Sequence, residues 1–172
     1  VILGGTAGAV PAYASGISPD TAARQVEHMR APGYKRIKQR IGFGPGDGIE
    51  AARETFCSLL HGELLMLDAN QAWDFETARL KCEQLGDLDL VWLEEPMPAD
   101  APDEDWISLS QSAPMKLAGG ENLTAEALER AAELGALSVI QPDISMTKIH
   151  LLIDVPTAHT ISMNERHIFI DV

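Results

Sequence analysis

Cysteine is scarce in this sequence, whose 172 residues include only Cys57 and Cys82. The two have no metal-ligand spacing, and we expect them to be reduced in a cytoplasmic protein. Long hydrophobic runs are also absent. None reaches the ~18 apolar residues that cross a bilayer, so we expect no membrane partner. Basic residues number 13 against 26 acidic ones, a net charge of −13. Phosphate binding needs clustered lysine and arginine, which argues against a nucleic-acid partner.

The rest of the composition is that of an ordinary globular domain. Hydrophobic residues make up 45% and charged residues 23% of the chain, both close to the usual shares. A chain of this length can build one sizeable core, and we expect residues 1–172 to form a single domain. The first residues contain neither an initiator methionine nor a cleavable leader. We therefore expect the sequence to enter a chain partway through.

Short β-rich apolar runs alternate with longer amphipathic stretches. Strands are predicted at 10–15, 34–41, 63–67, 88–93, 115–118, 137–140 and 160–163. Helices are predicted between them, at 19–30, 46–60, 75–85, 106–111, 124–134 and 147–158. Ser18, Asp74 and Thr124 are expected to cap three of these helices. Strands that alternate with helices of this length indicate βαβ units and a parallel sheet.

Two architectures share this alternation, an open doubly wound sheet and a (β/α) barrel. A doubly wound nucleotide-binding domain carries a glycine-rich turn after its first strand. Here Gly4-Gly5 precede that strand, and residues 42–48 lack the G-x-G-x-x-G spacing. Polar residues instead fall at the carboxyl ends of successive strands, the face on which barrels carry their active sites. The pattern therefore favours the barrel.

Acidic residues follow three consecutive predicted strands. Asp68, Glu94 and Glu121 lie 26 and 27 residues apart, about one βα unit each. In a barrel, consecutive strands would then present one carboxylate each at the same height. Acidic residues after strands can also be helix caps or solvated loop residues. Three in register favour a site for a hard divalent cation such as Mg²⁺.

More polar residues fall at the same predicted face. Lys38 and Arg40 share one face of their strand. They would meet an anionic substrate if that face lines the barrel, and an exposed edge strand is the alternative. Asp143 follows the sixth strand, where it would either orient a base on the next strand or cap a helix. His167 is a possible base or a structural residue.

Four motifs, about one unit apart, closely resemble the mandelate racemase/muconate lactonizing enzyme-like branch of the enolase superfamily. They are Asp68-Ala69-Asn70-Gln71, Trp92-Leu93-Glu94-Glu95-Pro96, Gly120-Glu121-Asn122 and Gln141-Pro142-Asp143. Residues 10–16 are similar to that branch's first barrel strand. The resemblance implies an α/β fold, a (β/α) barrel of the enolase-superfamily type that is truncated here. We expect six βα units, a possible seventh strand, no eighth strand and no capping domain, with residues 146–172 diverging from the family.

The same resemblance implies roles for particular residues. Asp68, Glu94 and Glu121 would bind Mg²⁺, with Mn²⁺ as a possible substitute. Lys38 would bind the carboxylate of a small anionic substrate. Asn70 would line the site, and Arg40 occupies the position where many members place a lysine base. An arginine, with a pKa above ~12, is a poor general base.

The family's chemistry is abstraction of the proton α to a carboxylate, giving an enediolate that the metal stabilises. In many members a β-hydroxyl then leaves, so that acid sugars are dehydrated, and other members racemise or epimerise their substrates. The resemblance therefore implies a Mg²⁺-dependent lyase or isomerase. A catalytically inert truncated relative that retains a metal site is the alternative. A nucleotide-binding module is disfavoured by the missing phosphate-binding loop.

An incomplete barrel would leave its first and last strands with unpaired backbone groups. Such edges favour pairing with another chain, so we expect a homo-oligomer. Residues 168–170, Ile-Phe-Ile, are a candidate added strand at such an interface.

Overall fold

The computed structural model describes residues 12–143, 160–164 and 167–171. Its strands form one eight-stranded sheet in the order β1-β2-β3-β4-β5-β6-β8-β7. Each neighbouring pair from β1 to β6 is parallel, whereas β6–β8 and β7–β8 are antiparallel. The strands are β1 Ala14–Ile17, β2 Arg36–Arg40, β3 Leu64–Asp68, β4 Leu90–Glu94, β5 Leu117–Gly119, β6 Val139–Ile140, β7 Thr160–Asn164 and β8 His167–Asp171.

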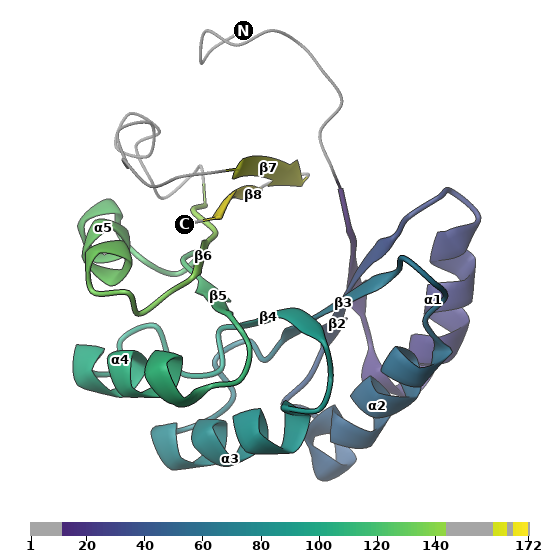
Figure 1. Cartoon of the computed structure of the whole chain (residues 1–172), viewed down its shortest axis with the longest axis horizontal. Helices are drawn as coiled ribbons and strands as arrows, with labels where there is room; N and C mark the ends of the chain where they lie inside the picture. The colour runs from purple at the N-terminus through teal and green to yellow at the C-terminus, as the bar shows by residue number, and fades with distance from the viewer. Residues whose placement is uncertain (1–11, 144–159, 165–166, 172) are drawn as a thin grey trace, which may run out of the picture.

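Helices connect the parallel strands and follow the outer side of the curved sheet (Figure 1). They are α1 Ala22–Arg30, α2 Ile49–Ser58, α3 Phe75–Leu85, α4 Asp103–Ser112 and α5 Ala125–Glu133. Two short 3-10 turns, η1 Pro19–Thr21 and η2 Pro45–Gly48, precede α1 and α2. The six parallel strands with outer helices confirm the predicted α/β architecture. No helix in the described part of the chain is long and apolar enough to cross a membrane.

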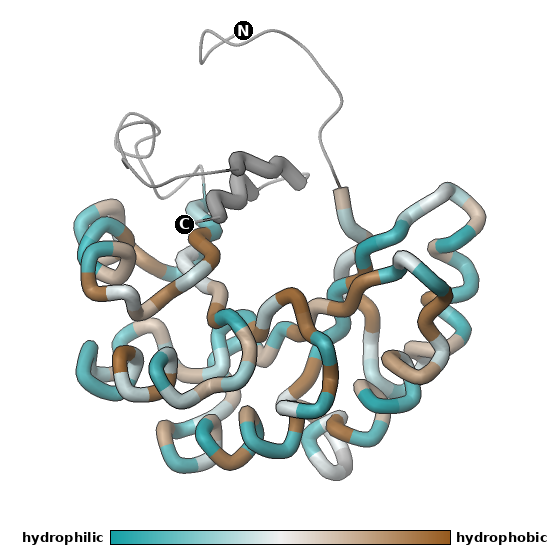
Figure 2. Tube along the Cα trace, viewed as in Figure 1, coloured by the Kyte–Doolittle hydropathy of each residue, from teal (hydrophilic) through white to brown (hydrophobic). Residues whose placement is uncertain are grey.

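The two faces of the sheet carry two separate hydrophobic clusters, because side chains alternate along each strand. The outer cluster joins strand residues such as Ile37, Leu65 and Leu67 to the helices. The inner cluster is smaller and consists of Tyr13, Met66, Trp92, Ala118 and Val139. Hydrophobic and hydrophilic stretches alternate along the helices in Figure 2, as expected for helices with one buried side. The small inner cluster leaves room on that face for polar side chains.

Side chains cap two of the helices as predicted. Asp74 Oδ1 accepts a hydrogen bond of 2.9 Å from the backbone N–H of Thr77 at the start of α3. Thr124 Oγ1 accepts one of 3.3 Å from the backbone N–H of Ala127 in α5. Ser18 occupies the N-cap position of η1, with Pro19 after it, as predicted, but its hydroxyl donates to Asp20 Oδ1 (2.6 Å) and makes no cap hydrogen bond.

The end of the chain differs from the prediction. The strand expected at 160–163 is confirmed as β7, but it runs antiparallel to its neighbour. A further strand, β8, pairs antiparallel with both β6 and β7, so it is not the parallel eighth strand of a barrel, which the prediction has missing. The 168–170 segment pairs with β6 and β7 of the same chain. The helix predicted at 147–158 lies outside the described residues, as do residues 10 and 11 of the first predicted strand.

Candidate active site

An ion cluster lies at the carboxyl ends of three neighbouring strands. Lys38 belongs to β2, and Asp68 and Glu94 are the last residues of β3 and β4. Lys38 Nζ is 3.0 Å from Asp68 Oδ2 and 2.7 Å from Glu94 Oε1. Asp68 and Glu94 lie opposite each other in the β3–β4 pairing. The structure therefore brings together two predicted metal ligands and the predicted substrate-binding lysine.

All three side chains are buried, with 8% of Lys38, 6% of Asp68 and 2% of Glu94 exposed. Burial alone would lower the pKa of Lys38, but the adjacent Glu94 and Asp68 carboxylates outweigh it and raise that pKa. Burial raises the pKa of Glu94, and the Lys38 ammonium opposes the rise. The Tyr13 ring adds a cation–π contact, with its centroid 5.6 Å from Lys38 Nζ. Lys38 thus acts as a buried counterion for two carboxylates.

The expectation of three carboxylates at one height is correct for Asp68 and Glu94 but wrong for Glu121. Glu94 pairs with Ala118 in the sheet, so Glu121 lies three residues further along, beyond the end of β5. The backbone turns at Gly120, where φ is +131° and an added Cβ would lie 2.5 Å from Leu128 Cδ1. The φ angle strains any residue with a side chain, so glycine suits this position. The turn leaves Glu121 half-buried and near enough to Glu95 to affect its ionisation.

Glu95, which follows the predicted ligand Glu94, also belongs to this acidic group. Its backbone adopts a positive φ of 40°, and both of its carboxylate oxygens accept hydrogen bonds of 2.9 Å from Asn122 Nδ2. Burial raises the pKa of Glu95 to about 7; Asn122 opposes this, and the charges of Glu121, Glu94 and Asp68 add to it. Several carboxylates therefore share one region, an arrangement that a bound cation would stabilise.

Sequence reasoning missed two side chains that contact Glu94. Gln141 Nε2 and Trp92 Nε1 donate to Glu94 Oε2 at 2.9 and 3.3 Å. Gln141 lies just beyond β6, so its proximity to Glu94 depends on how β4, β5 and β6 pair. Trp92 is two residues before Glu94 on the same strand, and the period of two could have indicated that they share a face.

The other predicted site residues are not members of the ion cluster. Arg40 lies opposite Asp68 in the β2–β3 pairing, but it is exposed. Asn70 is half-buried with a positive φ of 45°, and its backbone N–H donates to Asp68 Oδ1 at 3.0 Å. Asp143 is half-buried after β6. His167 begins β8, and its side chain lies outside the described part of the structure.

The ion cluster fits a hard divalent cation in part. Asp68 directs one oxygen and Glu94 directs both oxygens at the same positive charge, the ammonium of Lys38. Carboxylate oxygens are the ligands that Mg²⁺ prefers. Among the residues that the structure describes, no group of three His, Cys, Asp or Glu side chains is arranged to hold a metal ion. The complete set, with Glu121 as the third ligand, remains a prediction.

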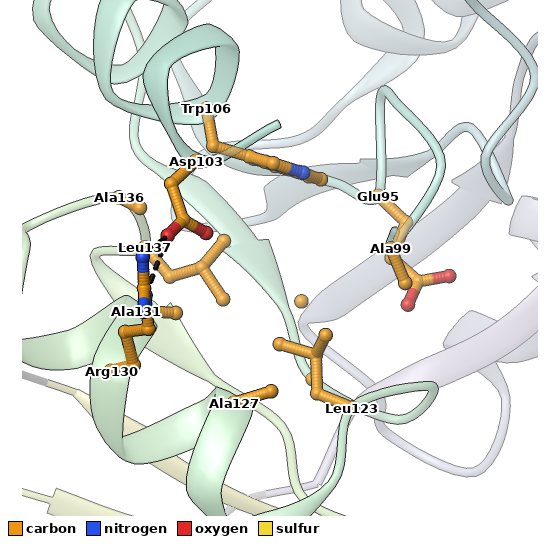
Figure 3. Close-up of a pocket in the computed structure, with 12 residues that line it drawn as sticks. Glu95, Ala99, Asp103, Trp106, Leu123, Ala127, Arg130, Ala131, Ala136 and Leu137 are labelled. Carbon is orange, nitrogen blue, oxygen red and sulfur yellow. Dashed lines mark hydrogen bonds and ion pairs between the residues drawn. The ribbon is translucent and has the colours of Figure 1, made fainter. Parts of the chain in front are cut away.

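A cavity of about 80 Å³ lies nearby, between α4 and α5 (Figure 3). Glu95 lines it together with Trp106, Leu123 and an ion pair between Asp103 and Arg130. Most of its remaining lining is alanine and glycine. Lys38, Asp68 and Glu94 do not line it, so this cavity is separate from the ion cluster.

Comparisons with known proteins agree with this geometry. The sequence profile described as "Enolase C-terminal domain-like" matches residues 21–148. L-talarate/galactarate dehydratase from Salmonella typhimurium is 40% identical over 128 residues, which cover 72% of this chain and 31% of the relative.

Two solved structures share the fold. A mandelate racemase/muconate lactonizing enzyme from Bordetella bronchiseptica is 40% identical with a TM-score of 0.77, over 81% of this chain and 39% of that one. A racemase from Streptomyces coelicolor with bound magnesium is 28% identical with a TM-score of 0.77, over 84% and 45%. The chain thus spans less than half of each of these proteins. The profile match over most of its length and the fold shared with these structures show that the chain belongs to the enolase superfamily, in the mandelate racemase/muconate lactonizing enzyme-like branch.

Proposed function

We propose that this chain carries the metal-binding part of an enzyme that abstracts the proton α to a carboxylate, with an acid sugar as the substrate. The observation that carries the proposal is the convergence of Asp68 and Glu94 on one positive charge, at 3.0 and 2.7 Å. Mg²⁺ would be held by these two residues and Glu121, and Mn²⁺ would substitute for it. A magnesium-bound racemase with the same fold supports this choice of metal.

The proposed chemistry needs positive charge at the substrate carboxylate, because loss of the α-proton leaves a second negative charge there. When bound, Mg²⁺ supplies part of that charge as a Lewis acid. The Lys38 ammonium, on a flexible stem beside the two ligands, supplies more. Arg40 contributes electrostatically from the neighbouring position on β2, since a guanidinium does not give up its proton at ordinary pH. Asp143 would orient a base on a neighbouring element.

After proton abstraction, we propose that the reaction follows one of two routes. Loss of a β-hydroxyl would make the protein an acid-sugar dehydratase, which the 40% identity to L-talarate/galactarate dehydratase supports. Return of the proton would make it a racemase or epimerase, which the Bordetella bronchiseptica relative supports. Arg40 favours a second candidate function, a relative that binds the metal without catalysis, because arginine is a poor base.

The metal assignment is tested by titrating the chain with Mn²⁺ in a calorimeter. Asp68→Ala, Glu94→Ala and Glu121→Ala should each weaken binding at least about 10-fold, because the remaining carboxylates cannot complete the coordination shell. Asp87→Ala is the control, since Asp87 pairs with Arg53 on the surface, and it should bind as the wild type does. Unchanged affinity in all three ligand variants would refute the proposed site.

The proton-transfer step is tested by following exchange of the α-proton in D₂O with a panel of acid sugars. Lys38→Ala should slow exchange sharply, whereas Lys81→Ala, which removes a surface partner of Asp47, should not. Arg40→Lys need not abolish exchange if Arg40 acts only through its charge. Full exchange in Lys38→Ala would rule out the role given to Lys38. Absence of exchange in a chain that binds Mn²⁺ would favour the inert relative.

A further inference from the structure

The two oxygens of the Glu94 carboxylate have different surroundings. Oε2 accepts hydrogen bonds from Gln141 Nε2 at 2.9 Å and from Trp92 Nε1 at 3.3 Å. The ammonium of Lys38 bridges both oxygens, at 2.7 Å from Oε1 and 2.8 Å from Oε2. Oε2 therefore accepts from two neutral N–H donors as well as from Lys38, whereas Oε1 contacts the Lys38 ammonium.

Asp68 also has one carboxylate oxygen that accepts from a neutral donor. Its Oδ1 accepts the backbone N–H of Asn70 at 3.0 Å, and its Oδ2 contacts Lys38 Nζ at 3.0 Å. Each of the two carboxylates thus has one oxygen that accepts from a neutral donor and a second that contacts the Lys38 ammonium; in Glu94 the ammonium also contacts the first oxygen. The neutral donors fix the rotation of each carboxylate about its terminal bond, which sets where the second oxygen points.

Gln141 is held in place for this contact. Only 1% of the residue is exposed, and its backbone N–H donates to the carbonyl oxygen of Gly119 at 2.9 Å, which ties it to β5. Its amide nitrogen faces Glu94, which is the orientation that an ionised carboxylate requires because it can only accept. Gln141 Oε1 is consequently turned away and has no donor among the described residues.

Trp92 is held by a contact with another aromatic ring. Its ring packs edge-on against Tyr13, with the centroids 5.9 Å apart and the planes at 78°. Tyr13 also lies beneath the Lys38 ammonium. The indole N–H is therefore placed by β4 and by an aromatic contact, independently of Gln141.

We propose that Gln141 and Trp92 are positioning residues for the metal ligand Glu94, and that they hold Oε2 so that Oε1 is presented to a divalent cation. The inference rests on the proposed function, since it needs Glu94 to be a ligand. Side chains that orient a ligand typically change metal affinity 10- to 100-fold when they are removed. Neither residue touches the cation itself.

The test is a titration with Mn²⁺, in which free Mn²⁺ is measured by electron paramagnetic resonance. Gln141→Met removes the donor with little change in volume, and Trp92→Phe keeps an aromatic ring beside Tyr13 but removes the N–H. Each should weaken Mn²⁺ binding by about 10-fold or more. The spectrum of the bound ion should also change, because a rotated carboxylate alters its ligand field.

Gln39→Met is the matched control. Gln39 is also a fully buried glutamine in the sheet, and neither of its amide atoms has a partner among the described residues. It follows Lys38 in β2 and therefore points to the opposite face. Its replacement should leave Mn²⁺ affinity within about twofold of the wild type. Far-UV circular dichroism of each variant establishes that it is folded, and if Gln141→Met does not fold, Trp92→Phe decides alone.

The outcomes separate this inference from the proposed function. If Glu94→Ala abolishes binding while Gln141→Met and Trp92→Phe bind Mn²⁺ as the wild type does, the positioning role is wrong and the metal site stands. If Gln39→Met weakens binding as much as Gln141→Met, the effect is general to the sheet and the inference is again wrong. If the wild-type chain does not bind Mn²⁺, both are overturned.

Discussion

A second buried ion pair, separate from the ion cluster, joins Arg30 at the end of α1 to Glu63, the residue just before β3. Arg30 Nε and Nη2 donate to the two carboxylate oxygens of Glu63 at 3.0 and 2.9 Å, and Nη2 also donates to the carbonyl oxygen of Ser58 at 2.8 Å. The Glu63 side chain is fully buried, and 19% of the Arg30 side chain is exposed. The hydrogen bonds from Arg30 lower the pKa of Glu63, against the effect of burial.

Arg30→Met should lower the free energy of unfolding by about 2 kcal/mol at pH 7, because it leaves a buried carboxylate without its partner. A lowered carboxyl pKa stabilises the folded state above the ordinary glutamate value of about 4.3, and this contribution is lost as the pH falls through the lowered pKa. The difference between wild type and variant should therefore shrink at low pH. Urea unfolding at pH 7 and at about pH 3.5 measures both effects.

Arg79→Met is the control for this prediction. Arg79 pairs with Glu76 and Glu83 on the exposed side of α3, where such pairs contribute about 0.5 kcal/mol or less. Equal losses in the two variants, or a difference that does not change with pH, would contradict the role given to the Arg30–Glu63 pair.

Single residues of the site were predictable to different degrees. Asp68, Glu94 and Lys38 follow from local patterns, because each lies in or just after an apolar strand whose alternation fixes its face. The contact of Gln141 with Glu94 could not be predicted, since it depends on the pairing of β4, β5 and β6 rather than on any local spacing. For a similar reason, Glu121 lies beyond the end of its strand, whereas Asp68 and Glu94 are the last residues of theirs. The number of residues between two predicted strands does not reveal the backbone turn at Gly120.

Helix α3 begins directly after a capping residue, Asp74. Asp74 accepts the backbone N–H of Thr77 at 2.9 Å, which satisfies one of the free N–H groups of the first turn. Asp74→Ala should lower the free energy of unfolding by about 1 kcal/mol. Chemical denaturation compared with Asp100→Ala, which changes an exposed loop aspartate, measures the effect. Equal stabilities of the two variants would show that the cap contributes nothing.

Elements with strong local signals were predicted best. The bounds of α3 agree with the prediction because a cap and an amphipathic stretch define them. Helix α4 begins earlier than predicted, at Asp103, since three acidic residues in its first turn and Pro102 before it favour a helix start. The antiparallel direction of β7 and β8 could not be predicted, because strand patterns indicate which residues are extended but not which neighbour they pair with.

At the scale of the whole molecule, the sheet has two edges. Among the described residues, β1 pairs only with β2, and β7 pairs only with β8. Unpaired backbone groups at such edges favour association with another chain, while the net charge of −13 opposes it. The predicted homo-oligomer therefore still needs a direct test.

Light scattering at increasing protein concentration provides that test. We expect a mass above the 18.6 kDa of one chain, and a further increase when added salt screens the repulsion between chains. Each sample should be compared at about 0.05 and 0.5 M salt, which span Debye lengths from well above to well below 10 Å. A monodisperse mass of one chain under all conditions would show that the edges do not associate.

The order of the six parallel strands has a consequence for how the protein folds. Each strand from β1 to β5 pairs with the next one in the sequence, so the parallel ladder can extend one βα unit at a time. An edge strand is held by one neighbouring strand, whereas an inner strand is held by two. Local opening should begin at the edges. In amide hydrogen exchange, β3, flanked on both sides by β2 and β4, should therefore exchange more slowly than β1 or β7, and uniform rates would mean that the whole sheet opens in one step.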